Sequence, residues 1–275
     1  MAVQSEVCAK SVLTKSGISD YAVNCYYGCL HNCVYCYARY MRKFNNHTEP
    51  WGQYLDAKIN APEVLAREVT RKAPGKIFFS SACDAWQPAE RKYELTRQCL
   101  KIAIDAGFSI SALTKSSLVT RDFDILSASP NVSLGCTITT VNESIRRKIE
   151  PAASSSESRI QTLTRARKMG IATWAFCGPL MPGLTDTPEN IEQLFAALST
   201  LELDQILIDK LNFRSGVFES VMDLLQRFYP ALTPMYRSLY QNQQEYDAYA
   251  DRLVVVVTEA ARAAGISSKL QLICR

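Results

Sequence analysis

Three helical stretches in this sequence end at a glycine and lead directly into an apolar, β-branched run. A glycine just past a helix adopts the left-handed conformation that closes the last turn. The pattern therefore predicts repeated helix-to-strand connections, which restrict the chain to α/β folds. The three junctions join residues 103–107 to 108–114, residues 166–170 to 171–177, and residues 261–265 to 266–274.

Further apolar runs predict strands at residues 76–81, 132–139 and 205–209, with amphipathic helical patterns between the strands. Strands that alternate with helices indicate βα units around a parallel sheet. Six or so such units predict a partial (β/α)6 TIM-like barrel, and a flat doubly wound sheet is the alternative that periodicity leaves open. The helix faces that carry this reading are Leu95, Cys99, Ile102, Ala103 and Ala106, and Ile191, Leu194, Phe195 and Leu198.

We expect residues 1–210 to form the partial barrel and residues 211–275 a helical extension that ends in the last strand and packs on the same domain. The extension is rich in tyrosine and glutamine, including Tyr236, Tyr240, Tyr246 and Tyr249. Such aromatic side chains can stack on nucleic-acid bases, but at this spacing they more often pack a helix against its neighbour.

Composition excludes few functions. The net charge of +4 is too small to indicate a nucleic-acid partner. No apolar stretch approaches the roughly 18 residues of a membrane helix, and the first residues lack the basic and apolar regions of a signal peptide. We therefore expect a cytoplasmic protein without membrane contact. In that reducing compartment ten cysteines indicate metal ligands, reactive thiols or small core residues, not disulfides.

One short loop concentrates the chemistry. Cys29, Cys33 and Cys36 follow a Cys-x3-Cys-x2-Cys spacing that can wrap around a cubane iron–sulfur cluster. A [4Fe–4S] cluster normally takes four cysteines, so three local ligands leave one iron open to a small chelating molecule. The alternative is a zinc site with Cys25 or His31 as fourth ligand, although structural zinc sites usually pair two separate ligand knuckles.

The loop, with tyrosine before its third cysteine, resembles the signature of the radical S-adenosylmethionine (radical SAM) superfamily. The resemblance implies that the cofactors are a [4Fe–4S] cluster and S-adenosylmethionine, whose amino and carboxylate groups chelate the open iron. Reduction of the cluster would release a 5′-deoxyadenosyl radical that abstracts hydrogen from a substrate. The partial barrel of that superfamily agrees with the βα pattern above.

Residues 24–186 further resemble the spore photoproduct lyase branch of this superfamily. The resemblance implies cofactor contacts for Tyr35, Ser81, Asp84, Lys115 and Thr139 and for the backbone of Leu180. Tyr35 and Leu180 would lie at the adenine, Ser81 and Asp84 at the methionine end, Lys115 at the carboxylate or ribose, and Thr139 at the ribose. The alternative is that Asp84 and Lys115 cap loops or form an ion pair. The motifs are Tyr35 and Tyr37, Ser80–Asp84, Gln87–Glu90, Leu113–Lys115, Arg121–Asp122, Thr137–Thr139, Ile149–Pro151 with Arg159, and Gly178–Leu180.

The same resemblance makes Tyr37 and Cys83 catalytic candidates, with Cys83 either a hydrogen donor to a substrate radical or a buried, inert thiol. The other cysteines show no ligand spacing, and we expect most of them in the core. They are Cys8, Cys25, Cys99, Cys136, Cys177 and Cys274.

The sequence thus predicts a radical SAM enzyme, lyase-like, with an unidentified substrate. A low-potential electron donor such as flavodoxin or ferredoxin is the expected partner. The DNA-engaging hairpin of the lyase is not recognisable after Asp209, so repair of thymine dimers is not favoured. A zinc-stabilised nucleic-acid-binding protein without catalysis is the second hypothesis.

Overall fold

An eight-stranded sheet forms the framework of the chain in this computed structural model, which describes residues 2–44, 47–214 and 216–273. All neighbouring strands in the sheet pair in parallel, except β2 and β3, which are antiparallel. The strands are β2 (Leu13–Lys15), β3 (Tyr21–Val23), β6 (Lys76–Phe79), β7 (Ser109–Thr114), β8 (Val132–Thr137), β9 (Ala172–Leu180), β10 (Gln205–Lys210) and β11 (Leu270–Leu272).

The order of the strands across the sheet decides between the two predicted architectures. It runs β11-β10-β9-β8-β7-β6-β3-β2, so the parallel strands follow each other in sequence order without a reversal. A doubly wound sheet requires such a reversal at its switch point. Within the described residues, the edge strands β11 and β2 do not pair with each other. The predicted partial barrel is confirmed, and the doubly wound alternative is wrong.

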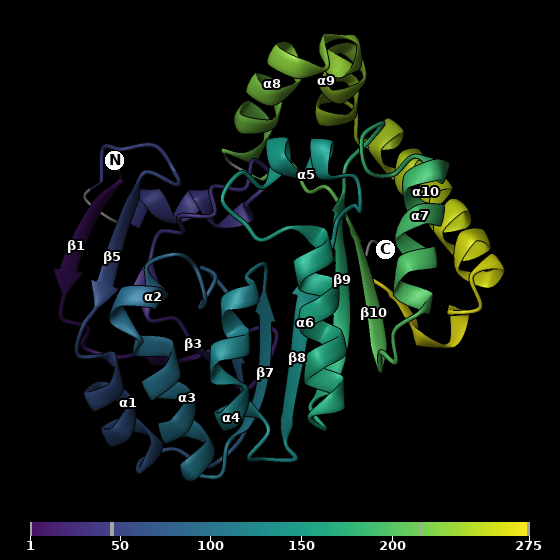
Figure 1. Cartoon of the computed structure of the whole chain (residues 1–275). Helices are drawn as coiled ribbons and strands as arrows, with labels where there is room; N and C mark the ends of the chain where they lie inside the picture. The colour runs from purple at the N-terminus through teal and green to yellow at the C-terminus, as the bar shows by residue number, and fades with distance from the viewer. Residues whose placement is uncertain (1, 45–46, 215, 274–275) are drawn as a thin grey trace.

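Helices connect the strands and cover the outer face of the sheet (Figure 1). Several begin where a side chain caps the first turn: the Ser155 hydroxyl accepts from the Ser158 N–H at 3.1 Å, and Thr187 caps the Asn190 N–H ahead of Pro188. The helices are α1 (Ala61–Val69), α2 (Glu90–Tyr93), α3 (Leu95–Asp105), α4 (Phe123–Leu126), α5 (Glu143–Ile149), α6 (Ser156–Lys168), α7 (Pro188–Ser199), α8 (Val217–Phe228), α9 (Thr233–Gln241) and α10 (Gln243–Ala263).

Glycine closes the helices as predicted. Gly107, Gly170 and Gly265 have φ angles of 79°, 78° and 70°, in the left-handed region. The strand predicted over residues 266–274 is wrong in extent, because residues 267–269 form a 3-10 turn and only β11 is extended. Cys274 lies outside the described residues.

A second, three-stranded sheet lies at the N-terminal side and was not predicted. Strand β5 (Tyr54–Lys58) pairs in parallel with β1 (Val3–Val7) and antiparallel with β4 (Tyr26–Tyr27). Because β4 ends two residues before Cys29, this sheet fixes the point at which the cysteine loop begins.

The C-terminal helices α8, α9 and α10 pack against the rest of the chain through buried apolar side chains. Leu253 and Val257 of α10 share a buried cluster with Ile191 and Leu194 of α7, whereas α8 and α9 stand above α5 (Figure 1). Tyr236 and Tyr249 are buried, in agreement with a packing role, and β11 returns to the main sheet beside β10. The division of the chain at residue 210 stays a prediction.

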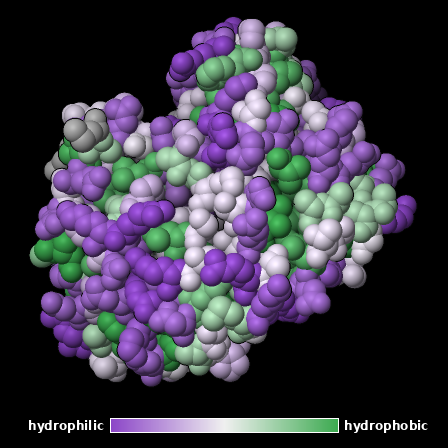
Figure 2. Space-filling view, in the orientation of Figure 1, coloured by the Kyte–Doolittle hydropathy of each residue, from purple (hydrophilic) through white to green (hydrophobic). Residues whose placement is uncertain are grey.

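Polar and apolar residues are intermixed over the face shown in Figure 2. Among the described helices, none has the length and apolarity that crossing a bilayer requires.

Candidate cluster site at the strand ends

The predicted site residues converge at one end of the sheet. Ser81 and Asp84 follow β6, Lys115 follows β7, Thr139 follows β8, and Leu180 is the last residue of β9. The carboxyl ends of parallel barrel strands meet at one face, which is where barrel enzymes carry their active sites.

The cysteine loop enters this face directly after β4. Gly28 has a φ angle of 80°, and a Cβ atom there would lie 2.5 Å from the Tyr54 carbonyl oxygen, so only glycine fits. The Gln87 side chain then clamps the loop: its Oε1 accepts from the Leu30 N–H at 2.8 Å, and its Nε2 donates to the Gly28 carbonyl at 3.2 Å.

The three cysteines of the loop favour a metal cluster chemically. Burial raises the pKa of the thiols of Cys29, Cys33 and Cys36, so thiolates there need a compensating positive charge. Backbone N–H groups favour the thiolate form, from Asp84 toward Cys29 and from Ala38 toward Cys36. A bound metal supplies the missing charge and holds cysteine deprotonated. The donor set therefore fits an iron–sulfur cluster.

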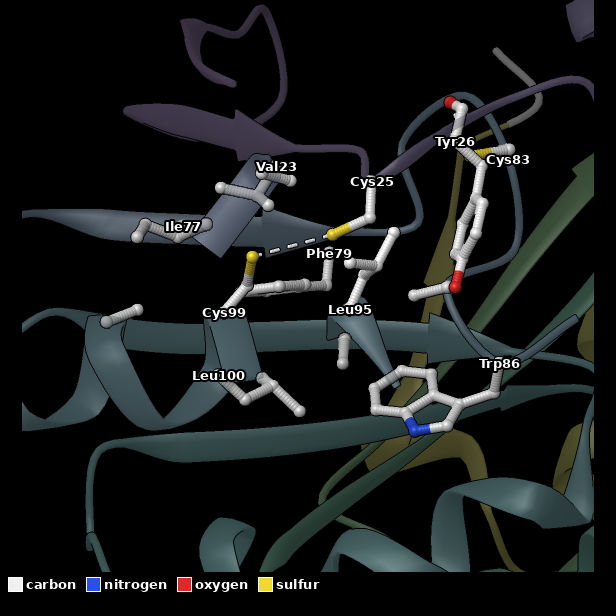
Figure 3. Packing of buried hydrophobic residues seen from close by; sticks show 14 of the residues in the cluster. Val23, Cys25, Tyr26, Ile77, Phe79, Cys83, Trp86, Leu95, Cys99 and Leu100 are labelled. Atoms are coloured by element: carbon white, nitrogen blue, oxygen red, sulfur yellow. Dashed lines mark hydrogen bonds between the residues drawn. The ribbon is translucent and has the colours of Figure 1, made fainter. Parts of the chain in front are cut away.

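The fourth ligands that the zinc alternative requires point elsewhere. The Cys25 sulfur lies 3.6 Å from the Cys99 sulfur inside the core and points toward α3 (Figure 3). His31 Nδ1 lies 3.0 Å from the Ala152 carbonyl oxygen. Within the described chain, no group of three or more His, Cys, Asp or Glu side chains converges closely enough to hold one metal ion. A cubane cluster does not require such convergence, because each thiolate binds a different iron atom.

Asp84 is held by four groups. Its Oδ1 accepts hydrogen bonds from the Trp86 N–H at 2.9 Å and the Thr114 hydroxyl at 2.7 Å. Its Oδ2 accepts from the Lys115 N–H at 2.7 Å and lies 3.3 Å from His31 Nε2. Burial alone would raise the pKa of Asp84, but His31 and these hydrogen bonds lower it to about 2. These contacts are those of the loop-capping alternative, and contact with a cofactor ammonium group stays a prediction.

Tyr35 belongs to a fully buried polar network. Its hydroxyl donates to Glu150, which forms an ion pair with Arg159 and accepts from the Thr139 hydroxyl at 3.3 Å. Burial would raise the pKa of Glu150, but the positive charges of Arg159 and Lys115 lower it. The network fixes the Tyr35 ring beside Cys36 and joins the ends of β8, α5 and α6.

Lys115 adds a second positive charge beside this network, with its Nζ 5.7 Å from the centroid of the Tyr35 ring. Burial would lower the pKa of Lys115, but the acidic groups of Cys33, Glu150 and Asp84 raise it, so the ammonium form is kept. An ammonium group here can attract an anionic ligand group. Its pairing with a cofactor carboxylate or ribose stays a prediction.

Asn24 organises the loop after β6. Its Nδ2 donates to the Ser81 hydroxyl at 2.8 Å, and its Oδ1 accepts from the Ala82 N–H at 3.0 Å. The Cys83 thiol is buried beside the Tyr26 carbonyl oxygen at 3.3 Å, and burial raises its pKa to about 12. A thiol with this pKa keeps its hydrogen at neutral pH, as a hydrogen donor must.

Tyr37 and Leu180 complete the predicted set. The Tyr37 hydroxyl donates to the Ser81 carbonyl, and its ring is half-exposed, 5.9 Å from the Arg214 guanidinium carbon. Leu180 is buried, and its carbonyl already accepts from the Leu211 N–H at 3.0 Å. The catalytic and cofactor-binding roles of these residues stay predictions.

The structure adds residues to which the sequence assigned no role. Gln87, Glu150 and Arg159 belong to motifs seen in the sequence, but only their contacts reveal a clamp and a buried ion pair. Asn24 carries no sequence signal beyond its place at the end of β3. Cys25, Cys99, Cys136 and Cys177 are buried as expected, whereas Cys8 is exposed.

The chain belongs to the radical SAM superfamily. The sequence pattern described as "Radical SAM superfamily" matches residues 23–198, which include the cysteine loop and the strands from β4 to β9.

Two relatives with similar sequences cover large parts of the chain. An uncharacterised protein of Methanocaldococcus jannaschii is 38% identical over 173 residues, which are 63% of this chain and 65% of that protein, just under two thirds of its length. The radical SAM Nalpha-GlyT isomerase of Pseudomonas phage M6 is 22% identical over 218 residues, covering 78% of this chain and 44% of that protein.

A spore photoproduct lyase variant solved with bound AdoMet and dinucleoside spore photoproduct has a TM-score of 0.70 and 13% identity. The similarity covers 97% of this chain and 80% of that one. At this identity the likeness shows the fold, and it extends over nearly the whole chain.

Proposed function

We propose that the chain is an enzyme that holds a [4Fe–4S] cluster on Cys29, Cys33 and Cys36 and cleaves S-adenosylmethionine reductively. One observation carries the proposal: three cysteines in the Cys-x3-Cys-x2-Cys spacing, Cys29 and Cys33 buried and Cys36 partly buried, lie on one clamped loop at the strand ends of a partial barrel. When bound, the cluster and S-adenosylmethionine supply a 5′-deoxyadenosyl radical that abstracts a hydrogen atom from the substrate.

The residues around the loop have the chemistry to bind and orient S-adenosylmethionine. The ammonium group of Lys115 suits its carboxylate, and the carbonyl and hydroxyl groups of Ser81 suit its ammonium group. Asp84, whose four contacts support the loop, positions both the β6 and β7 strand ends. Tyr35, Thr139 and the backbone of Leu180 would contact the adenosyl group.

Anaerobic reconstitution with iron and sulfide tests this proposal. We expect a brown protein that, with dithionite and S-adenosylmethionine, forms 5′-deoxyadenosine or returns intact cofactor after reaction with its substrate. Cys136→Ala, in the core of the sheet, is the matched control and should keep the cluster. Fully loaded protein that never cleaves S-adenosylmethionine with any substrate class would contradict the proposal.

For the substrate we propose a thymine-containing nucleic acid or nucleotide. The solved lyase variant holds a dinucleoside spore photoproduct, and the phage relative is named an Nalpha-GlyT isomerase. Tyr37 contacts the Ser81 carbonyl at the barrel mouth, and Tyr40 lies three residues further along the same 3-10 helix. The two side chains expose 45% and 38% of their surface, and the Arg214 guanidinium lies over the Tyr37 ring. Exposed aromatic rings and arginine are the groups that stack on bases.

Formation of 5′-deoxyadenosine should be measured with thymidine oligonucleotides, thymine-free oligonucleotides, a peptide mixture and a metabolite extract in parallel. Stimulation by the thymine-containing oligonucleotide, lost in Tyr37→Ala, is the expected result. Stimulation by the peptide mixture or the extract alone would contradict this choice of substrate.

A further inference from the structure

We propose that the C-terminal ends of α5 and α8 form the docking surface for an acidic electron-transfer protein of the flavodoxin or ferredoxin class. The proposal rests on the proposed function, because a cluster that cleaves S-adenosylmethionine must receive electrons from outside the chain. We call this surface the α5/α8 patch; its members are Arg147, Lys148, Arg227, Phe228 and Tyr229.

The patch combines positive charge with exposed aromatic surface. Arg147, Arg227 and Phe228 are exposed, with Phe228 showing 41% of its surface to solvent. The Lys148 Nζ donates to the Tyr229 hydroxyl at 3.1 Å and lies 5.2 Å from the Phe228 ring centroid. The Arg227 guanidinium carbon lies 4.9 Å from the same ring. Two cations, Lys148 and Arg227, thus lie against an exposed ring, and Arg147, next to Lys148 in the sequence, adds an exposed positive charge. This composition is typical of protein–protein contact surfaces.

The patch is connected directly to a predicted cluster ligand. The carbonyl of Ile149, the residue after Lys148, accepts a hydrogen bond from the Val34 N–H at 2.9 Å, and Val34 follows Cys33. Cys33 also shares one buried cluster with Ile149 and with Leu224 and Leu225 of α8, and Tyr229 packs against that cluster. Through Ile149 and Tyr229 the patch therefore adjoins the buried cluster that contains Cys33.

Figure 1 shows α8 above α5, and Figure 2 shows polar and apolar side chains intermixed on the lobe that α8 and α9 form. The acidic residue nearest in the chain to Arg227 is Asp223, one turn earlier on α8, which also faces Arg39.

The positive charge of the α5/α8 patch favours an acidic electron donor as its occupant. Low-potential flavodoxins and ferredoxins are acidic, and electron transfer proceeds through weak, transient interfaces that charge steers. In the productive encounter one electron passes from the reduced donor to the cluster. The donor is oxidised by one electron, the cluster is reduced by one, and no covalent bond changes.

Stopped-flow reduction of the reconstituted, cluster-loaded chain tests the patch. The loss of cluster absorbance is the measured signal. The probe is a purified acidic flavodoxin, fully reduced beforehand, and dithionite serves as a small-molecule reductant. The variant is Arg147→Glu with Arg227→Glu. The control is Lys168→Glu with Arg262→Glu: these two side chains are also exposed and also lie in the last turns of helices, at the far end of the barrel.

We expect the second-order rate constant for flavodoxin to fall at least about tenfold in the patch variant at low ionic strength, with less than about a twofold change in the control. The difference should shrink as salt is added. Reduction by dithionite should be unchanged in both variants.

Equal flavodoxin rates in the patch variant and the unmodified chain would overturn the proposal, as would an equal fall in the control. A patch variant that dithionite also reduces slowly would overturn it too, because the charges would then act on the cluster itself. A chain that holds no reducible cluster at all would instead contradict the proposed function, so the two failures are distinguishable.

Discussion

Replacing Arg159 by methionine removes the positive partner of Glu150 from a site that water does not reach. Both side chains are 0% exposed, and Arg159 also donates to the carbonyl oxygens of Thr137 at 2.8 Å and Ser154 at 2.7 Å. The substitution keeps most of the apolar volume. It leaves a buried carboxylate without its ion-pair partner and two carbonyls without their donor.

The expected cost is large. Breaking a buried ion pair by removing one member costs about 3–5 kcal/mol. The lost hydrogen bonds to the two carbonyls overlap with that figure and add about 1 kcal/mol, so we expect about 4–6 kcal/mol of lost unfolding free energy. Adding Glu150→Gln removes the unpaired charge. The double variant should therefore be more stable than Arg159→Met alone by at least about 1 kcal/mol.

The pH dependence has a defined sign. The pKa of Glu150 is lowered in the folded chain, so this carboxylate stabilises the fold at neutral pH. That contribution is lost as the pH falls through the folded pKa, below the ordinary glutamate value. In Arg159→Met the pKa of Glu150 rises, because the guanidinium no longer offsets burial. The unpaired carboxylate then destabilises the fold at neutral pH, so its protonation as the pH falls should narrow the stability difference between the variant and the unmodified chain.

Urea unfolding of the cluster-free chain under reducing conditions, followed by circular dichroism and by tryptophan fluorescence, measures these differences. The control is Arg167→Met, a partly exposed arginine paired with Asp204 at 3.1 Å, which should lose less than about 1 kcal/mol. If Arg159→Met does not fold, Tyr35→Phe removes one hydrogen bond to Glu150 and should lose about 1.5–3 kcal/mol. The reasoning is refuted if Arg159→Met costs no more than Arg167→Met, or if Tyr35→Phe costs nothing.

Three further predictions concern the site. Alanine at any one of the three loop cysteines should abolish iron binding, measured as iron per chain after reconstitution. The control Cys25→Ala should retain the iron. Iron retained in the loop variants would contradict the ligand assignment. Lys115→Met should keep the iron content but weaken S-adenosylmethionine binding at least about tenfold, by calorimetry, because a partly buried cation is removed from the proposed carboxylate site; unchanged affinity would remove Lys115 from the site. Cys83→Ala should keep both iron and S-adenosylmethionine cleavage and change only the fate of the substrate radical, seen in the product spectrum; an unchanged product would favour the inert-thiol alternative. The loop cysteines are Cys29, Cys33 and Cys36.

The sequence predicts the main sheet well because its strands are apolar runs bounded by glycine. Residues 108–114 and 171–177 lie almost entirely within β7 and β9, since parallel strands covered by helices need continuous apolar sequences. The three-stranded sheet was missed for the opposite reason. Strand β1 is half-exposed and polar, and β5 contains Asp56 and Lys58 although it is fully buried.

The candidate site also has a part that the sequence predicts and a part that it does not. The cysteine spacing is local, so the loop could be recognised without any knowledge of the fold. The contacts of Gln87, Asn24 and Arg159 join residues 57, 58 and 9 positions apart. Such contacts depend on which strand ends meet at the barrel mouth, and no local pattern predicts them.

The most direct test of the central claim is electron paramagnetic resonance of the reduced, reconstituted chain before and after S-adenosylmethionine is added, with iron and sulfide quantified on the same sample. The account predicts roughly four iron and four sulfide per chain, and a cluster signal that S-adenosylmethionine shifts because it binds the open iron. A reconstituted chain that contains no iron, or a cluster whose signal is unchanged by saturating S-adenosylmethionine, would contradict it.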